Sequence, residues 1–342
     1  MQTSIFKSGI RAFVVTLSTV FAALLAILLF FVVIALYEDE EDISSDMKIS
    51  IQPNAHGIRK KQPDSAPVIL KMKLEGVIGT ELLNGELFQK QLTESREGDL
   101  KNDRVKGILL VINSPGGGVI DADSIYRSLL QYKQRFNVPV YTYVDGMCAS
   151  GGMYVACATD KIFASEASLI GSVGVIVSPI LNYTKLLDKI GVDALTVMAG
   201  KDKDELNPFR PWKEGEADNL QKLVNVFYDQ FVRVVSHGRP EISHEALVQD
   251  YGAKVFSSPE ALEKGYIDGA NVNESDALLA LLSALAIKDD YYQVVELKKD
   301  DWVSTLFDTE SFWRHGKIRH ELVLPGGLDS RLKDPVLYLY QP

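Results

Sequence analysis

The sequence INSPGGG, residues 112–118, directly follows an apolar, β-branched segment at residues 105–112. A second run, CASGGMY at residues 148–154, follows a similar segment at residues 140–144. Glycine permits positive φ angles, so these runs can turn backbone N–H groups toward a ligand. The second run also places Ser150 just before a predicted helix at residues 152–158, where free N–H groups favour negative charge. A hydroxyl nucleophile and backbone donors are what attack on a carbonyl carbon requires.

Apolar β-rich segments alternate with helical segments through the middle of the chain. Strands are predicted at residues 68–74, 105–112, 140–144, 161–164, 173–177 and 194–198. Helices are predicted at residues 121–136, 182–190, 214–237, 244–251, 259–264 and 275–286. Continuous apolar strands separated by helices indicate an α/β fold with a largely parallel sheet.

The N-terminal segment predicts a membrane anchor. The 26 residues from 12 to 37 contain no charged side chain. A helix of that length measures about 39 Å and can cross a hydrocarbon core of about 30 Å. A cleaved signal peptide is the alternative, but its apolar region spans only about 7–15 residues. Lys7 and Arg11 precede the segment, so the positive-inside rule places the N-terminus in the cytoplasm.

We therefore expect five regions in a protein of the cell (inner) membrane. They are a cytoplasmic N-terminus at residues 1–11, a transmembrane anchor at 12–37, a linker at 38–65, a catalytic domain at 66–288 and a C-terminal extension at 289–342. The catalytic domain is expected on the extracytoplasmic or periplasmic side. The formal net charge of −10 argues against a nucleic-acid partner.

A serine hydroxyl needs a base, and the residues alone leave its identity open. No histidine lies between the linker and the helix at residues 214–237, which gives a Ser-His-Asp triad little support. A lysine can serve instead when its amine is neutral. Lys203 follows the predicted strand at residues 194–198 and Gly200, in a loop of the kind that carries catalytic groups. An ordinary exposed loop lysine would fit the same position, since Asp202 and Asp204 flank it.

Other ligands and cross-links have weaker support. The two cysteines and five histidines show no metal-ligand spacing, so we expect neither a metal nor a cofactor. Cys148 and Cys157 flank the serine, and a disulfide between them is conceivable. Packing of two small buried side chains is the better interpretation.

Five motifs follow one another in the order of a known family. They are Ser-Pro-Gly-Gly at 114–117, Ala-Ser-Gly-Gly-x-Tyr at 149–154, Ile-Gly-Ser-x-Gly-Val at 170–175, Gly-x-x-Lys at 200–203 and Ala-x-x-x-Gly-x-x-Asp at 261–268. Over residues 66–285 the chain resembles the signal peptide peptidase A (protease IV) family of membrane-anchored Ser–Lys peptidases. It is similar to the short, single-copy forms, including SohB-type proteins. The resemblance implies a ClpP/crotonase-like α/β fold preceded by one transmembrane helix.

The resemblance also implies roles for individual residues. Ser150 would be the nucleophile and Lys203 the general base, while Ser172 would orient the lysine. The N–H of Gly151, together with that of Gly116 or Gly117, would form the oxyanion hole. Ser172 could equally be a turn-forming serine. A third glycine at residue 118 departs from the motif.

The family resemblance further implies peptide substrates near the membrane, such as remnants of signal peptides. Tandem-copy members of the family combine a serine and a lysine from different copies of the domain. A single-copy chain is therefore expected to form a homo-oligomeric ring in which neighbouring subunits share the dyad.

Three alternatives stay open. A crotonase-like acyl-CoA enzyme would share the fold but would not need Ser150. An inactive membrane scaffold would need neither Ser150 nor Lys203. The apolar segment at residues 335–340 could be an edge strand or packing arm, or it could occupy the substrate groove.

Overall fold

The computed structural model describes residues 5–37, 47–299 and 336–339 and divides the chain into two units, residues 1–46 and 47–342. The first unit contains a single helix, α1 (Ile5–Tyr37). Its stretch Arg11–Phe30 has a mean hydropathy of 2.7 and is long and apolar enough to cross a membrane. A helix of this composition near the N-terminus fits either a membrane span or a signal sequence.

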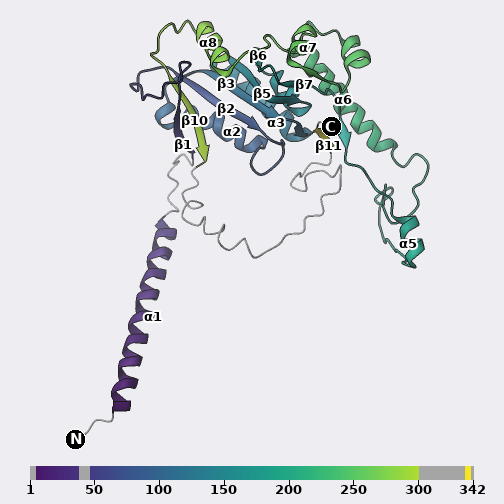
Figure 1. Cartoon of the computed structure of the whole chain (residues 1–342). Coiled ribbons are helices and arrows are strands. Elements are labelled where there is room, and N and C mark those ends of the chain that lie inside the picture. The colour runs from purple at the N-terminus through teal and green to yellow at the C-terminus, as the bar shows by residue number, and fades with distance from the viewer. Residues whose placement is uncertain (1–4, 38–46, 300–335, 340–342) are drawn as a thin grey trace. The chain divides into compact units, whose positions relative to one another are not determined.

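The second unit is built on an eight-stranded sheet (Figure 1). Its order is β1 (Met47–Gln52), β10 (Gln293–Lys299), β2 (Val68–Glu75), β3 (Val105–Ser114), β5 (Val140–Ala149), β7 (Leu169–Gly171) and β9 (Val255–Ser257), with β6 (Lys161–Ala164) also on β5. The pairs from β10 through β7 are parallel, and the outermost pairs, β1 with β10 and β7 with β9, are antiparallel. The predicted α/β class with a largely parallel sheet is confirmed.

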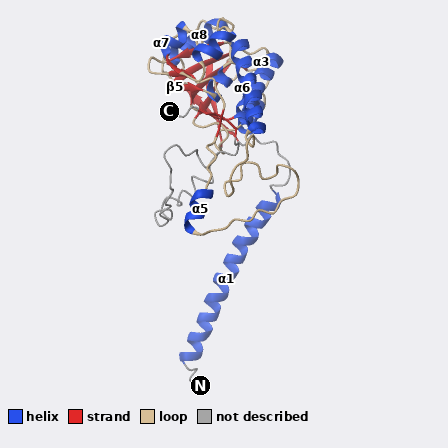
Figure 2. Cartoon of the chain, turned by 90° about the vertical axis from the view of Figure 1, so that its right-hand side faces the viewer, coloured by secondary structure: helices blue, strands red, loops and turns tan. Residues whose placement is uncertain are grey.

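Helices cover both faces of the sheet, as Figure 2 shows. The helices of the second unit are α2 (Gly85–Glu94), α3 (Val119–Phe136), α4 (Gly151–Ala156), α5 (Thr184–Ile190), α6 (Asp218–Gly238), α7 (Ser258–Glu263) and α8 (Glu274–Ala284), with short turns at Gly98–Leu100 and Ala246–Tyr251.

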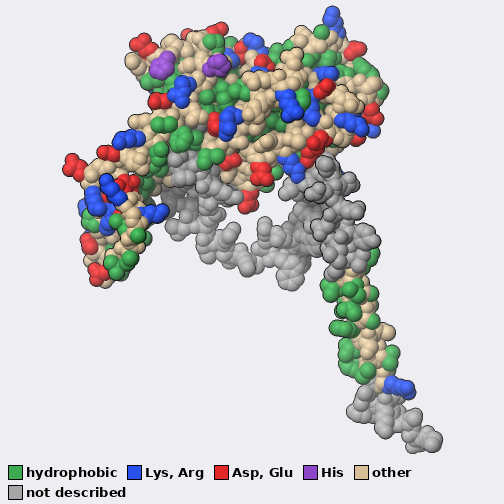
Figure 3. Space-filling model, turned by 180° about the vertical axis from the view of Figure 1, so that it is seen from behind, with side chains coloured by type: hydrophobic (Ala, Val, Ile, Leu, Met, Phe, Trp, Pro, Cys, Tyr) green, Lys and Arg blue, Asp and Glu red, His purple; other side chains and the backbone are tan. Residues whose placement is uncertain are grey.

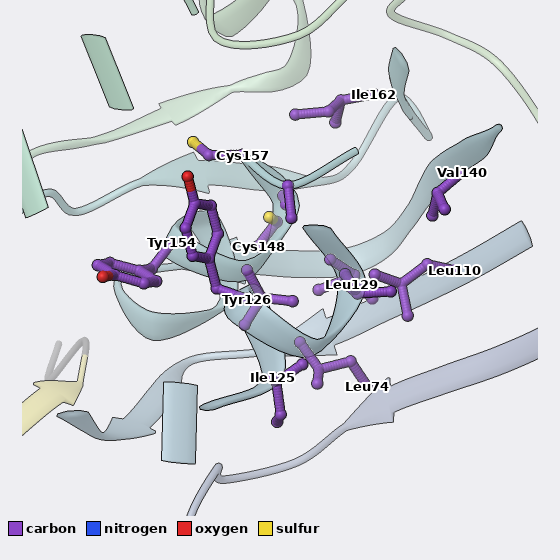
Figure 4. Close-up of a cluster of buried hydrophobic side chains, with 14 of the residues drawn as sticks. Leu74, Leu110, Ile125, Tyr126, Leu129, Val140, Cys148, Tyr154, Cys157 and Ile162 are labelled. Carbon is purple, nitrogen blue, oxygen red and sulfur yellow. The ribbon is translucent and has the colours of Figure 1, made fainter. Parts of the chain in front are cut away.

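Strand β3 explains why both faces need cover. Alternate side chains of a strand point to opposite faces. Ile108, Leu110 and Ile112 join the larger core with α3 and α4, whereas Leu109 and Val111 join a second core with α8. Figure 4 shows part of the larger core around Leu110. An apolar run on both faces is typical of a buried parallel strand.

Several local elements differ from the prediction. The predicted strand at residues 194–198 is not a strand, and Leu195 and Val197 are 90% and 88% exposed. The predicted strand at residues 173–177 is reduced to β8 (Ile176–Val177). Neither segment has a neighbouring strand of the large sheet to pair with, so β-propensity alone does not produce the predicted strands.

Two segments that were assigned outside the catalytic domain contribute strands that the pattern did not indicate. β1 lies in the segment assigned to the linker and β10 in the segment assigned to the C-terminal extension. They pair antiparallel from Met47↔Lys299 to Gln52↔Val294. β10 then joins β2, so both segments belong to the sheet.

Residues 178–217 form an extension that we call the arm. Within the described residues, all of its hydrogen bonds and ion pairs stay inside the arm or reach the start of α6. Tyr183 stacks on Phe209 with ring centroids 6.2 Å apart, and its N–H donates to the Pro208 carbonyl at 2.7 Å. The arm therefore has its own internal connections, apart from the sheet.

Candidate active site

Ser150 occupies a strained turn between β5 and α4. Its φ and ψ are +52° and −117°, and the residue is 1% exposed. Its N–H donates to the Gly171 carbonyl at 2.8 Å, and its carbonyl accepts the Tyr154 N–H at 2.9 Å. Such a backbone persists only where the surroundings enforce it, and strained residues cluster at active sites. The sharp turn also leaves the N–H of Gly151 at the start of α4, where helical N–H groups have no partner within the helix.

The two glycine-rich runs meet because β3 and β5 are neighbours. Ser114 pairs with Cys148 across them. The Ser114 hydroxyl donates to the Gly76 carbonyl at 2.6 Å, and its oxygen accepts the Gly116 N–H at 3.1 Å. A Cβ on Gly152 would lie 3.0 Å from the Ser114 carbonyl oxygen, so α4 packs tightly on this run. The structure thus brings the INSPGGG run next to the nucleophile candidate.

The short strand β4 (Gly116–Gly118) distinguishes between the two candidate oxyanion glycines. The Gly116 carbonyl accepts the Ile78 N–H, and the Gly118 N–H donates to the Ile78 carbonyl, both at 2.9 Å. Successive residues of a strand direct their N–H groups to opposite edges, so the N–H of Gly117 faces away from Ile78. The Gly116 N–H already has an acceptor in Ser114. The geometry therefore favours Gly117 over Gly116 as the second donor.

Ser172 lies beside the nucleophile candidate. β7 pairs with β5 through Gly171↔Ala149, and Ser172 follows directly. Ser172 is buried, has φ of +57°, and its N–H donates to the Lys254 carbonyl at 2.7 Å. This position fits both the orienting role and the turn-forming alternative.

Lys203 is exposed and lies in the arm. Within the described residues of one chain, no hydrogen bond or ion pair joins it to Ser150 or Ser172. Its neighbours are engaged elsewhere, since Arg210 Nε donates to Asp204 Oδ2 at 2.7 Å. The structure places the serine candidates together and leaves the lysine candidate apart from them.

Arg210 organises the loop that carries Lys203. Its guanidinium binds the carboxylates of Asp204 and Glu216, and Glu216 also accepts the N–H groups of Leu206 and Lys213. Hydrogen bonds from Arg210 lower the pKa of Asp204, and they lower the pKa of Glu216 to about 2. Both carboxylates are therefore ionised at neutral pH and bind Arg210.

No described histidine takes part in this site. His56, His237 and His244 make no hydrogen bond to Ser150, while His315 and His320 lie outside the described residues. Cys148 and Cys157 are unpaired thiols in the core (Figure 4). Burial raises the pKa of both thiols, that of Cys157 to about 12. In the part of the chain that the structure describes, no three His, Cys, Asp or Glu side chains gather as a metal site would need.

Comparison with known proteins assigns the family. The model of peptidase family S49 matches residues 133–287. A putative signal peptide peptidase SppA of Enterococcus faecium is 32% identical over 287 residues, which are 80% of this chain and 82% of that protein. The chain belongs to peptidase family S49. It is therefore a peptidase, and the resemblance seen in the five motifs is confirmed.

Two further relatives of the S49 chain are named as proteases. A putative protease of Methanocaldococcus jannaschii is 38% identical over 53% of this chain and 57% of its own length. Protease 4 of Haemophilus influenzae is 26% identical over 68% of this chain but only 37% of its own length. Among solved structures, a ClpP1 mutant from Listeria monocytogenes matches 61% of this chain and 94% of its own, with 20% identity and a TM-score of 0.40.

One hydrogen-bond network of the S49 chain was not indicated by the motif analysis. The Tyr154 hydroxyl donates to Asp123 Oδ1 at 2.8 Å, and Gln230 Nε2 donates to the same oxygen at 3.0 Å. These side chains connect α4, which follows Ser150, to α3 and α6. The only sequence signal was the tyrosine in the Ala-Ser-Gly-Gly-x-Tyr motif, because its two partners are distant in the chain.

Asp268, the last residue of the fifth motif, has a structural role. It accepts hydrogen bonds from the Ile162 N–H at 2.8 Å, Lys161 Nζ at 2.9 Å and Arg239 Nη1 at 2.7 Å. Burial opposes its ionisation, but these donors together keep the pKa of Asp268 below its usual range. The motif aspartate therefore connects β6 to the end of α6.

Proposed function

We propose that this peptidase is a membrane-anchored serine endopeptidase with Ser150 as nucleophile and Lys203 as general base. The observation that carries the proposal is the arrangement around Ser150. A strained, buried serine is followed by Gly151, whose N–H has no hydrogen-bond partner among the described residues, and Gly117 directs its N–H to the outer edge of β4. The C-terminal strand β11 (Val336–Leu339) pairs with that same edge, which is where the backbone of a peptide substrate would lie.

The mechanism follows from these positions. The neutral amine of Lys203 accepts the proton of Ser150 Oγ as the oxygen attacks the peptide carbonyl. The N–H groups of Gly151 and Gly117 stabilise the oxyanion. The lysine then protonates the leaving amine, and water hydrolyses the acyl-enzyme. Ser172 would accept or donate a hydrogen bond that orients the lysine amine. No cofactor enters these steps.

We propose that each subunit lends Lys203 to the Ser150 of its neighbour in a cyclic homo-oligomer. The proposal is supported by the arm, which is internally connected and exposes many large apolar side chains (Figure 3). The most exposed include Leu181, Leu186, Ile190, Leu195 and Val197. Apolar surface of this extent is typical of an interface. An interface that excludes water also favours the neutral lysine amine, and a head-to-tail contact must close into a ring.

The substrates would be extended peptides close to a membrane, including remnants of signal peptides. The name of the Enterococcus faecium relative supports this class. Helix α1 would anchor the chain, and the cations Lys7 and Arg11 would keep its N-terminus in the cytoplasm. The catalytic domain would then lie on the extracytoplasmic side.

A fluorophosphonate probe and a peptide-hydrolysis assay test the dyad. The probe should label the wild-type chain at Ser150, and Ser150→Ala and Lys203→Ala should each lose about 10⁴-fold in activity. Lys201→Ala is the matched control, because Lys201 lies two residues away on the same exposed loop. An unlabelled Ser150 would support the inactive scaffold instead. Near-normal turnover in Lys203→Ala would show that another residue is the base.

Subunit mixing tests the shared dyad. Exchange of Ser150→Ala subunits with Lys203→Ala subunits should restore part of the activity, since some sites then contain both intact residues. If mixed oligomers form and remain inactive, the dyad is assembled within one chain.

A further inference from the structure

Three helices begin directly after the three segments of the proposed site. α3 follows the glycines of β4, α4 follows Ser150, and α6 follows the arm that carries Lys203. The position of each segment therefore depends on how its helix is held. One group of hydrogen-bonded side chains joins these three helices to one another.

This group is a closed triangle of side chains from α3, α4 and α6, which we call the polar triangle. The Tyr154 hydroxyl donates to Asp123 Oδ1 at 2.8 Å. Gln230 Nε2 donates to the same carboxylate oxygen at 3.0 Å and to the Tyr154 hydroxyl oxygen at 2.8 Å. The other carboxylate oxygen, Asp123 Oδ2, accepts a hydrogen bond from Arg127 Nε at 2.7 Å. Both oxygens of the aspartate thus have donors.

The polar triangle is packed against apolar and aromatic side chains. Tyr154 is fully buried, and its ring packs edge-on against that of Tyr126, with centroids 5.2 Å apart (Figure 4). The ring of Phe231 packs on it at the same distance. Apolar contact is non-directional, whereas a hydrogen bond requires a defined distance and angle. A fully bonded polar group in a core therefore specifies one arrangement of the helices that carry it.

Gln230 lies where α6 leaves the core. Phe231 and Val235, which follow it, are buried, whereas Leu223 and Val226, which precede it, are exposed. The helix begins twelve residues before Gln230, directly after the arm. Those twelve residues span about 18 Å, so a tilt of about 10° at Gln230 moves the first turn of α6 by about 3 Å. A small change at the polar triangle is thus enlarged at the arm.

We propose that Gln230, Tyr154 and Asp123 are positioning residues that fix the angle at which α6 leaves the core, and with it the place where the arm presents Lys203. The catalytic consequence rests on the proposed role of Lys203 as the base, because a misplacement of about 1 Å can lower a rate by about 10²-fold. The Tyr154 N–H also donates to the Ser150 carbonyl at 2.9 Å. The polar triangle therefore holds the turn of the nucleophile as well.

The distance between two spin labels tests the proposal without any turnover. The labels are attached to exposed positions of the full-length protein, at Asn219→Cys in the first turn of α6 and Gln134→Cys near the end of α3. The two native cysteines are buried, and labelled chains are diluted with unlabelled ones so that distances within one chain are recorded. The otherwise unchanged chain should give one narrow distribution. Gln230→Met removes both donated bonds at similar side-chain length, and it should broaden the distribution or shift its mean by about 3 Å.

Kinetics of the same variants separate positioning from stability. Gln230→Met should lower kcat by about 10²-fold and leave KM unchanged, with the melting temperature within about 4 °C of the wild type. Gln221→Met is the matched control, because Gln221 is exposed on the same helix and its amide donates within α6 to Asn225 Oδ1 at 2.8 Å. The control should leave the distances, kcat and KM unchanged.

A second variant, Tyr154→Phe, covers failure of Gln230→Met to fold. It removes one hydroxyl and keeps the ring, and Tyr126→Phe is its control. It should broaden the distribution less than Gln230→Met does, because the direct bond from Gln230 to Asp123 remains. Unchanged distances in Gln230→Met, or in Tyr154→Phe where the first variant does not fold, would overturn the proposal.

The two kinds of measurement also distinguish this proposal from that of the dyad. Changed distances with a normal kcat, in a protein that Lys203→Ala inactivates, would overturn the positioning role. If Lys203→Ala keeps its turnover, the assignment of the base is wrong, and the distances alone decide whether the polar triangle sets the direction of α6.

Discussion

Replacement of Gly117 by alanine tests the oxyanion geometry most directly. A Cβ on Gly117 would lie 2.0 Å from the Ile78 carbonyl oxygen and 2.6 Å from its nitrogen, at a φ of +156°. Carbon and oxygen in contact need about 3.3 Å, so β4 must move by about 1 Å or more. Oxyanion donors act over about 2.7–3.1 Å, and loss of one donor lowers kcat by about 10²–10³-fold. We expect that loss, with about 1–3 kcal/mol of destabilisation from overpacking.

The assay is peptide hydrolysis at saturating substrate, combined with chemical denaturation of the same samples. Gly98→Ala is the matched control, because Gly98 also has a positive φ, +50°, but an added Cβ there meets nothing within 4 Å. The control should lose about 1–2 kcal/mol of stability and keep its activity. A folded Gly117→Ala chain with wild-type kcat would refute the assignment of Gly117 as a donor.

Three further predictions concern the supporting structure. Asp268→Ala leaves the Arg239 guanidinium without its buried partner and should destabilise the domain by about 3 kcal/mol in denaturant unfolding. Because ionised Asp268 stabilises the fold and its pKa is lowered, the wild type should lose stability as pH falls below about 4, and the variant should lose less. Arg210→Gln removes the hydrogen bonds that hold the loop around Lys203. It should lower kcat by about 10²-fold and leave the melting temperature of the protein unchanged. Cys148 and Cys157 should resist alkylation at pH 8 until the protein unfolds, since burial raises the pKa of both thiols.

The sequence predicted the parts of the fold that depend on local pattern. Strand β3 was recognised because its apolar residues are continuous, which is how a strand buried on both faces appears. β1 and β10 were missed because both carry charged side chains. Their strand character depends on pairing across almost the whole chain, from Met47 to Lys299. Residues 194–198 had the composition of a strand but no sheet edge to join, so tertiary context overrode propensity.

The candidate site was likewise predicted only in part from the sequence. Ser150, Gly151 and the glycines of β4 were recognised from motifs, because a strained turn and a close backbone approach restrict which residue types fit. The direction of each N–H could not be predicted, since it depends on the register between Gly117 and Ile78. The separation of Lys203 from Ser150 within one chain was likewise invisible to the motif order.

The amino-acid sequence alone determined the family, the α/β class, the apolar N-terminal helix and the candidate serine, because these rest on composition, periodicity and residues close together in the chain. Only the tertiary structure decided that the N–H of Gly117, unlike that of Gly116, faces the edge of β4 with which the C-terminal strand β11 (Val336–Leu339) pairs. The physical reason is that a backbone N–H is available or engaged according to which distant strand lies beside it. Strand pairing joins segments that are far apart in the chain, so the residue pattern of one segment does not reveal which strand it will pair with.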